Sequence, residues 1–277
     1  MSIEKTMNEI TGTLQRQKLF GSRYVSPRTV DVWLPPAYDP AQRHAVLYMH
    51  DGQNLFDPTL AYGGVDWGMD ETISRMTATG ELPPLIVVGV WNTAKRVQEY
   101  MPQKPLAGVS ARPLLAEFIS KAGGAPLSDL YLRFLVEEVK PWVDANYPTI
   151  TDPSHTAIMG SSMGGLISLY ATVEYPQVFG RAGCVSTHWP IGGELLIEQL
   201  CAALPKPGQH KFYFDFGTRT LDAAYEPFQT RWDAEIAAVG YTHNVDWLTL
   251  KFEGAEHSET SWRERVHIPL KFLLGQE

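Results

Sequence analysis

The stretch MGSSMGG, residues 159–165, lies between two apolar runs, HTAI before it and LISLYAT after it. Gly160, Ser162 and Gly164 match the pattern Gly-x-Ser-x-Gly, in which the serine sits on a tight, strained turn between a strand and a helix. The two glycines are needed because such a turn brings the strand and helix backbones so close that a Cβ atom would clash. The stretch therefore predicts a strand-turn-helix unit that exposes Ser162.

Other roles for these glycines compete with that prediction. A phosphate-binding loop needs a lysine after its last glycine, and Leu166 occupies that place after Gly165. A dinucleotide-binding loop has a different glycine spacing and follows the first strand of its unit, whereas this stretch lies past the middle of the chain. Glycine and serine also favour an ordinary helix cap. The pattern alone does not distinguish a serine nucleophile from an ordinary helix cap, so the rest of the sequence must be considered.

Short apolar runs alternate with helical periodicity along the chain. This alternation predicts the α/β class, with a mostly parallel eight-stranded sheet and helices on both faces. The first two runs alternate polar and apolar residues, as an antiparallel edge does, and the later ones are almost continuously apolar, as buried parallel strands are. The predicted strands are residues 13–20, 28–35, 44–50, 84–91, 155–161, 181–187, 210–217 and 245–252.

We expect the 277 residues to form one domain, because 44% of them are hydrophobic and can bury a substantial core. One segment, residues 92–126, breaks the alternation. It is rich in proline, glycine and alanine, and it contains only one short helical piece, PLLAEFISKA. Loops of this length are either functional or poorly ordered. We therefore interpret the segment as an insertion near the active site.

Composition limits the partners of the chain. A net charge of -8 with no basic patch argues against nucleic acid and anionic membranes. No run approaches the roughly 20 apolar residues that span a bilayer, and the first residues lack a signal-peptide pattern, so a cytoplasmic protein is expected. Cys184 and Cys201 are expected to be buried thiols. No His-Glu-x-x-His or Cys-x-x-Cys spacing occurs, so neither a metal nor a cofactor is expected.

A serine nucleophile needs a histidine as base and a carboxylate to orient that histidine. In this architecture they follow the serine in the order acid, then histidine. Three of the eight histidines precede Ser162, His210 and His243 come just before or at the start of strands, and His267 lies in the last helical pattern. His257 follows the last strand in EGAEHSETSW, at the sheet edge where ligands bind. His257 is therefore the predicted base.

The acid is expected after the strand HKFYFDFG. Asp222 lies in the following loop, GTRTLDAAYEP, from which its side chain can reach His257. Asp215 lies inside the strand and Asp233 inside the next helical pattern. Asp222 is the predicted acid, and Asp215 is the alternative.

The oxyanion formed during acyl transfer needs two backbone donors in this architecture. One is the N–H after the nucleophile, that of Met163. The second comes from the loop after the third strand, MHDGQNLFDP, and is the N–H of Gln53 or Asn54. In the same loop, His50 and Asp51 could alternatively form half of a metal site.

With these features the chain resembles the putative esterase family of α/β-hydrolases, which includes S-formylglutathione hydrolases, feruloyl and acetylxylan esterases, enterochelin-type esterases and mycolyltransferases. The resemblance covers nearly the whole chain and is carried by RTVDVWLPPAYDP with LYMHDGQNLFD, GSSMGGLISLY, FDFGTRTLD and GAEHSETSW. It implies the triad Ser162, Asp222 and His257. Relatives often carry the acid soon after the glycine of a Gly-Thr turn, where this chain has Arg219 and Thr220, so the resemblance implies an acid displaced to Asp222.

The expected activity is hydrolysis of small or medium acyl esters through an acyl-enzyme on the serine. Alternatives are an acyltransferase with the same triad, an esterase specific for siderophore or carbohydrate-linked esters, and a non-catalytic binding protein, which would have lost triad members. Trp91, His188 and Trp189 follow strand ends at the catalytic edge and are expected to wall the pocket. Core packing is an equal alternative for the two tryptophans.

Overall fold

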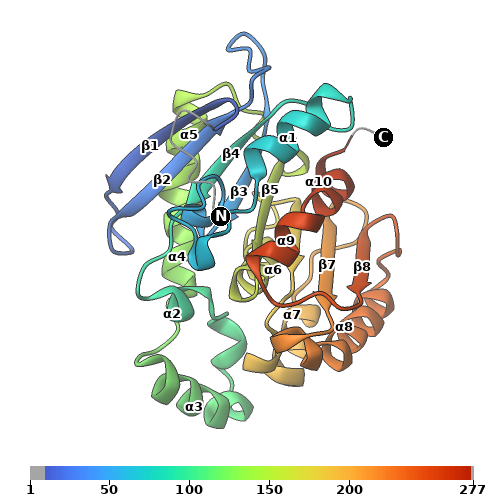
Figure 1. The fold of residues 1–277 in the computed structure, drawn as a ribbon. Helices are drawn as coiled ribbons and strands as arrows, with labels where there is room; N and C mark the ends of the chain where they lie inside the picture. Colours follow the sequence, from blue (N-terminus) through green and yellow to red (C-terminus); the bar gives the residue numbers. More distant parts are fainter. Residues whose placement is uncertain (1–9, 276–277) are drawn as a thin grey trace.

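All eight predicted strands form, and they lie in one sheet of order β1-β2-β4-β3-β5-β6-β7-β8 (Figure 1). The structure is a computed structural model that describes residues 10–275. β1 and β2 run antiparallel to their neighbours, and every pairing among β3 to β8 is parallel. The α/β prediction is therefore confirmed. The strands are β1 (Thr13–Phe20), β2 (Arg28–Leu34), β3 (Ala45–His50), β4 (Leu85–Val90), β5 (Thr156–Ser161), β6 (Arg181–Val185), β7 (Lys211–Gly217) and β8 (Trp247–Phe252).

Strand β3 shows why the central strands are continuously apolar. Val46 and Tyr48 belong to a core on one face of the sheet, whereas Leu47 and Met49 belong to a second core on the other face. Successive side chains of a strand point to opposite faces, so a strand covered on both sides needs apolar residues at every position. The helices on both faces supply that cover.

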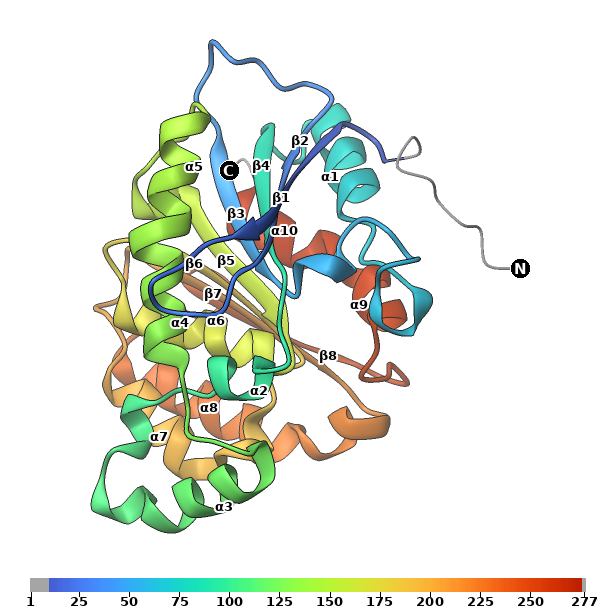
Figure 2. The same ribbon diagram turned by 90° about the vertical axis from the view of Figure 1, so that its left-hand side faces the viewer.

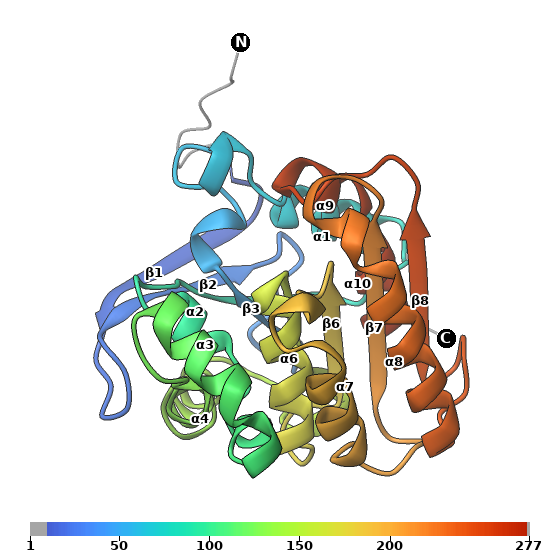
Figure 3. The same ribbon diagram turned by 90° about the horizontal axis from the view of Figure 1, so that it is seen from below.

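The two layers of helices are visible in Figure 3, where α1, α9 and α10 lie on one side of the sheet and α4, α6, α7 and α8 on the other. One π-helical segment, Leu135–Val139, joins α4 to α5. The helices are α1 (Met69–Ala78), α2 (Arg96–Tyr100), α3 (Arg112–Ala122), α4 (Ser128–Phe134), α5 (Lys140–Asn146), α6 (Met163–Glu174), α7 (Gly193–Ala202), α8 (Glu226–Val239), α9 (Glu259–Arg265) and α10 (His267–Leu274).

The segment 92–126 contains two helices rather than the single predicted piece. Helix α2 buries Tyr100 in the core, whereas α3 buries only Phe118. Two 3-10 turns, Lys104–Leu106 and Val109–Ala111, connect them. Figures 1 and 2 both place α3 at the lower end of the molecule, farther from the sheet than α2. Within residues 10–275, no helix is both long and apolar enough to cross a membrane.

The parallel strands β3, β5, β6, β7 and β8 end at the same edge of the sheet, so the loops that follow them come together there. The loop after β3 folds back tightly over β4. A Cβ atom on Gly52 would lie 2.5 Å from the carbonyl carbon of Gly89, so only glycine fits at this position. The fold thus gathers, at one edge, the loops on which sequence analysis placed the site.

Candidate active site

Ser162 lies on the turn between β5 and α6 with φ 59° and ψ -121°, a conformation that residues with a side chain rarely adopt. Its N–H donates to the Val185 carbonyl at 2.9 Å, and its own carbonyl accepts the N–H of Gly165 at 3.1 Å. A Cβ atom on Gly160 would lie 3.0 Å from the backbone of Gly164, which is the close approach that the sequence pattern implied. The turn holds Ser162 in a strained, fixed position.

Asp222 and His257, which come from different loops, meet beside this turn. Oδ1 of Asp222 lies 2.6 Å from Nδ1 of His257. The other carboxylate oxygen accepts the Ser186 hydroxyl at 2.7 Å and the Gly217 N–H at 2.6 Å. Burial by itself would raise the pKa of Asp222, but the hydrogen bonds from His257, Gly217 and Ser186 outweigh it and hold that pKa below its usual value. Asp222 is therefore a buried, ionised partner for His257.

Asp215, the alternative acid, has a different partner. Its oxygens accept from Nε and Nη2 of Arg265 at 3.1 and 3.0 Å. They also accept the Tyr213 hydroxyl at 2.9 Å and the Ser186 N–H at 3.1 Å. The structure thus brings Asp222, and not Asp215, to His257.

Ser186 links the two carboxylates, and sequence analysis did not single it out. It follows β6 with φ 43°, its hydroxyl donates to Asp222, and its Oγ accepts from Nε1 of Trp262 and Nη2 of Arg265, both at 3.0 Å. Its place just after a strand that ends at the catalytic edge was the available signal. The contacts themselves join segments far apart in the chain, which no local pattern reveals.

Two side chains of the insertion, those of Asn92 and Arg96, hydrogen-bond to the loop after β3. Asp51 has φ 56°, and its carboxylate accepts from Nε and Nη2 of Arg96, each at 2.7 Å, and from Nδ2 of Asn92 at 2.6 Å. Burial would raise the pKa of Asp51, but the charge and hydrogen bonds of Arg96 lower it overall. The Asn54 N–H donates to the Asp51 carbonyl at 2.9 Å, so it is already engaged in the turn. That bond uses one of the two expected oxyanion donors, and the N–H of Gln53 remains the predicted second donor.

The alternative of half a metal site in this loop involves side chains that are engaged by protein groups. Nδ1 of His50 lies 2.8 Å from the Tyr131 hydroxyl, and both oxygens of Asp51 are bound by Arg96. Burial lowers the pKa of His50 to about 3, with Arg96 adding to the effect, so this ring is neutral.

A cavity of about 280 Å³ opens over Ser162 and His257. Arg96 brings the insertion to its wall, and Glu259 brings α9. Burial and the nearby Asp51 raise the pKa of Glu259. The cavity is lined by Asp51, Asn54, Tyr62, Arg96, Ser161, Ser162, His257, Glu259 and Trp262.

The three residues expected to wall the pocket lie outside this cavity. Trp91 donates to Oδ2 of Asp31 at 2.9 Å and lies under the guanidinium of Arg16, beside the antiparallel edge strands. Trp189 is fully buried, stacks on Trp232 with ring centroids 5.2 Å apart, and donates to Gln229. Trp189 therefore packs in the core, which was the alternative to a place in the pocket wall. His188 lies near Ser162 and His257, and its Nδ1 lies 2.6 Å from the Tyr225 hydroxyl.

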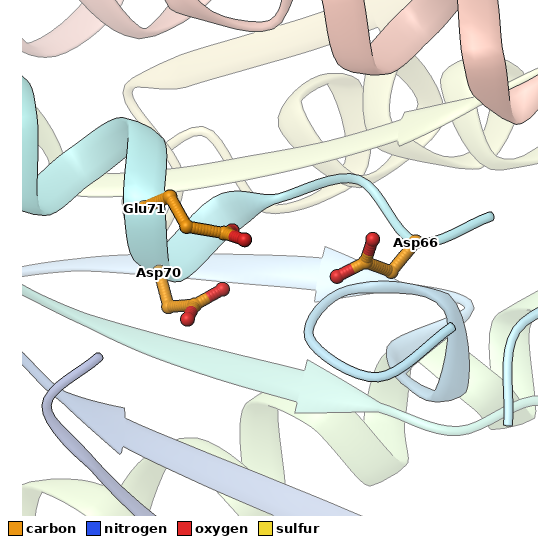
Figure 4. Close-up of side chains that lie close together, drawn as sticks. All are labelled: Asp66, Asp70 and Glu71. Carbon is orange, nitrogen blue, oxygen red and sulfur yellow. The ribbon is translucent and has the colours of Figure 1, made fainter. Parts of the chain in front are cut away.

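One further group of carboxylates was not noticed in the sequence. Oxygens of Asp66, which precedes α1, and of Asp70 and Glu71, which lie in its first turn, are within 4.8 Å of one another (Figure 4). Carboxylates grouped in this way are ligands that a divalent cation can use. Here Arg263 contacts Asp66 and lies 3.2 Å from Oε1 of Glu71, so a protein cation already balances part of the charge. Asp70 accepts the Thr11 N–H at 2.9 Å.

Comparison with known proteins relates the chain to esterases. The protein YbbA of Bacillus subtilis (strain 168) is 26% identical over 209 residues, which cover 75% of this chain and 72% of YbbA. A solved ferulic acid esterase superposes with a TM-score of 0.67 at 17% identity, covering 95% of this chain and 98% of that one. The enterobactin esterase FES from Shigella flexneri gives a TM-score of 0.64 at 18% identity, covering 96% and 59%. These two likenesses show a shared fold.

The family model described as "Putative esterase" matches residues 22–268, which is most of the chain. That span includes the serine turn, the acid loop and the histidine loop described above. The chain therefore belongs to this esterase family of the α/β-hydrolase superfamily.

Proposed function

We propose that the protein is a serine carboxylic-ester hydrolase that works through an acyl-enzyme on Ser162. The observation that carries the proposal is the 2.6 Å contact between Asp222 and His257, in a cavity that both His257 and Ser162 line. A serine hydroxyl becomes a useful nucleophile only when a correctly oriented histidine can take its proton. The ionised Asp222 provides that orientation by accepting the proton on Nδ1 of His257, which leaves Nε2 as the base.

In the first half of the reaction, Nε2 of His257 takes the proton of Ser162 as Oγ attacks the ester carbonyl. The tetrahedral oxyanion lies between the N–H groups of Met163 and Gln53. His257 then gives its proton to the departing alcohol. In the second half, His257 takes a proton from water, which attacks the acyl group, and the same proton returns to Oγ as the acid leaves. No step requires a metal or a cofactor.

The substrate class that fits the site is an ester of a small or medium acyl group. The cavity of about 280 Å³ limits the size, and Arg96 and Glu259 favour substrates that carry polar groups. Esters of hydroxycinnamic acids and of siderophores are reasonable members of a test panel, because the structural neighbours are named for ferulic acid and enterobactin.

A fluorophosphonate probe tests the nucleophile. The wild-type protein should be labelled at one residue, Ser162, identified by peptide mass spectrometry, and Ser162→Ala should not be labelled. The adjacent Ser161, which lines the same cavity, supplies the matched control, because Ser161→Ala should still react. Labelling of Ser162→Ala at the wild-type rate would end the proposal, and loss of turnover in EDTA that a divalent ion restores would show that the mechanism is incomplete.

A further inference from the structure

The hydroxyl of Ser186 binds the carboxylate oxygen of Asp222 that His257 does not use. Ser186 follows β6 and is fully buried. Its Oγ lies 2.7 Å from Oδ2 of Asp222 and 3.0 Å from both Nε1 of Trp262 and Nη2 of Arg265. The carboxylate comes from the turn after β7, and the two nitrogens come from α9. One oxygen atom therefore joins the acid turn to the helix that follows the histidine loop.

The direction of these three hydrogen bonds follows from the chemistry of the partners. The indole nitrogen of Trp262 and the guanidinium of Arg265 can only donate. A serine oxygen has two lone pairs and one proton, so the two donors occupy both lone pairs. The remaining proton must point to Asp222, which as a carboxylate can only accept. The hydroxyl of Ser186 thus has one orientation in which all of its bonds are made.

The backbone of Ser186 is strained in the position that presents this hydroxyl. Its φ is 43°, in the left-handed region that residues with a Cβ atom rarely adopt and that glycine adopts freely. Its N–H donates to Oδ1 and to the carbonyl of Asp215, at 3.1 and 2.9 Å, which holds the residue in place. Strained residues of this kind cluster at active sites, where the surrounding structure fixes them. A side chain at this position is therefore expected to have a use that glycine could not supply.

The hydroxyl acts on a carboxylate that already has two other donors. Oδ1 of Asp222 contacts Nδ1 of His257, and Oδ2 accepts the Gly217 N–H as well as the Ser186 hydroxyl. Hydrogen bonds to the charged form of a carboxylate favour that form, and the bond from Ser186 contributes to lowering the pKa of Asp222. The charged donor Arg265 polarises the Ser186 hydroxyl, which strengthens the bond that this hydroxyl donates.

We propose that Ser186 is a positioning residue of the triad, whose hydroxyl fixes the Asp222 carboxylate in the orientation that meets Nδ1 of His257. This inference rests on the proposed function, because the orientation of Asp222 matters only if His257 is the base. Ser186 keeps its proton throughout the reaction and acts through Asp222 alone. Trp262 and Arg265 support it by occupying the two lone pairs of its oxygen.

The substitution Ser186→Ala removes the hydroxyl and leaves the triad side chains in place. We expect kcat on p-nitrophenyl acetate to fall about tenfold with KM nearly unchanged, because the orientation of the base matters in the transition state. The rate of fluorophosphonate labelling should fall by a similar factor. Ser168→Ala is the matched control: Ser168 is equally buried, and its hydroxyl donates to the Gly164 carbonyl of its own helix at 2.7 Å, so both rates should stay at the wild-type level.

The pH profile of kcat/KM separates positioning from a merely structural role. On the acid side, activity is lost as the coupled pair of Asp222 and His257 takes up a proton. Without the hydroxyl of Ser186 the carboxylate is more basic, so the pair takes up that proton at a higher pH. The acid-side midpoint of Ser186→Ala should therefore lie about 0.5 to 1 pH unit above that of the wild type. A loss of stability alone would leave this midpoint in place.

Other charged and titratable groups also face this pair. They are His188, Tyr225, Glu259 and, on the other side of Ser186, Arg265. None of them is replaced in Ser186→Ala, so their contributions are common to both proteins. The difference between the two pH profiles therefore measures the effect of the hydroxyl.

Ser186→Gly tests the same role in a backbone that is easier to fold. Glycine accepts a φ of 43° without strain, so this variant should fold even where Ser186→Ala does not. It also lacks the hydroxyl, so it should show the same loss of kcat and the same upward shift of the acid-side midpoint. Circular dichroism and urea denaturation would establish that each variant is folded.

Wild-type kcat in folded Ser186→Gly would overturn the inference, as would a loss of kcat with no shift of the midpoint. The proposed function fails on a different result, which is labelling of Ser162→Ala. A protein whose Ser162→Ala variant is unreactive and whose Ser186→Gly variant is fully active would keep the triad and lose only the role given to Ser186.

Discussion

Asp215 and Asp222 lie on β7 and on the turn that follows it, and both are almost fully buried. Asp215 is bound by two nitrogens of Arg265, a group that stays charged at every accessible pH. Asp222 is bound by His257, a ring that can gain and lose a proton and that lines the cavity. Both carboxylates are hydrogen-bonded to Ser186. The comparison teaches that the partner of a buried carboxylate, more than its burial, separates a structural charge from one that can serve in proton transfer.

Replacing Asp222 should have the largest effect on the reaction. Asp222→Asn keeps the size of the side chain but removes the negative charge that holds the proton on Nδ1 of His257. We expect kcat to fall about 10³- to 10⁴-fold. Steady-state kinetics on a p-nitrophenyl ester would measure the change, with circular dichroism to establish that the variant is folded. If kcat drops less than tenfold, another group must orient His257.

Replacing Asp215 should mainly lower the stability of the protein and should change kcat little. Asp215→Asn leaves the Arg265 guanidinium buried with no carboxylate to balance it. Breaking a buried ion pair in this way typically lowers the free energy of unfolding by about 3–5 kcal/mol. Urea denaturation would measure it, and kcat per folded molecule should stay within a few-fold of wild type. A large loss of kcat with unchanged stability would mean that the two carboxylates have been assigned the wrong roles.

Sequence analysis separated these two aspartates because it could use strand order. The apolar runs located the eight strands, and parallel strands end at one edge, so a residue in the loop after β7 was predicted as the acid in preference to one inside the strand. Sequence reasoning also located the glycine-flanked turn at Ser162, because a close backbone approach leaves a local signature. These features depend on neighbours in the chain or on the order of elements.

The features that sequence analysis did not find depend on contacts between distant segments. Arg96 binds Asp51 from the insertion, and Arg265 binds Asp215 from α9. Spacing along the chain carries no signal for either of these pairs. Trp189 shows the related problem of direction: a tryptophan just after a strand at the catalytic edge can point to the cavity or to the core, and here it stacks on Trp232 in the core.

His50 can be compared with His257 in the same way. Unlike His257, His50 has no hydrogen bond to a carboxylate within residues 10–275. His50 is buried beside Arg96, and its pKa is lowered to about 3, whereas an unfolded chain gives histidine a pKa of about 6.5. Between these two values the unfolded state binds more protons than the folded state, so the free energy of unfolding must fall as the pH falls. His50 should therefore cost about 2 kcal/mol of stability between pH 6 and pH 4, a loss that begins near pH 6.5 and ends near pH 3.

His50→Asn isolates this contribution, since asparagine does not titrate. Asp222 also loses stability on acidification, because its pKa is lowered in the folded protein, but that contribution is present in both proteins and cancels in the difference. Urea denaturation at a series of pH values should give a wild-type curve that is steeper than the variant curve below pH 6.5, by at most about 1.4 kcal/mol per pH unit. At pH 7.5 and above, the two curves should differ only by a constant, which measures the lost contact with Tyr131. Parallel curves across the acid range would show that His50 accepts a proton in the folded protein, and that burial beside Arg96 does not keep this site neutral.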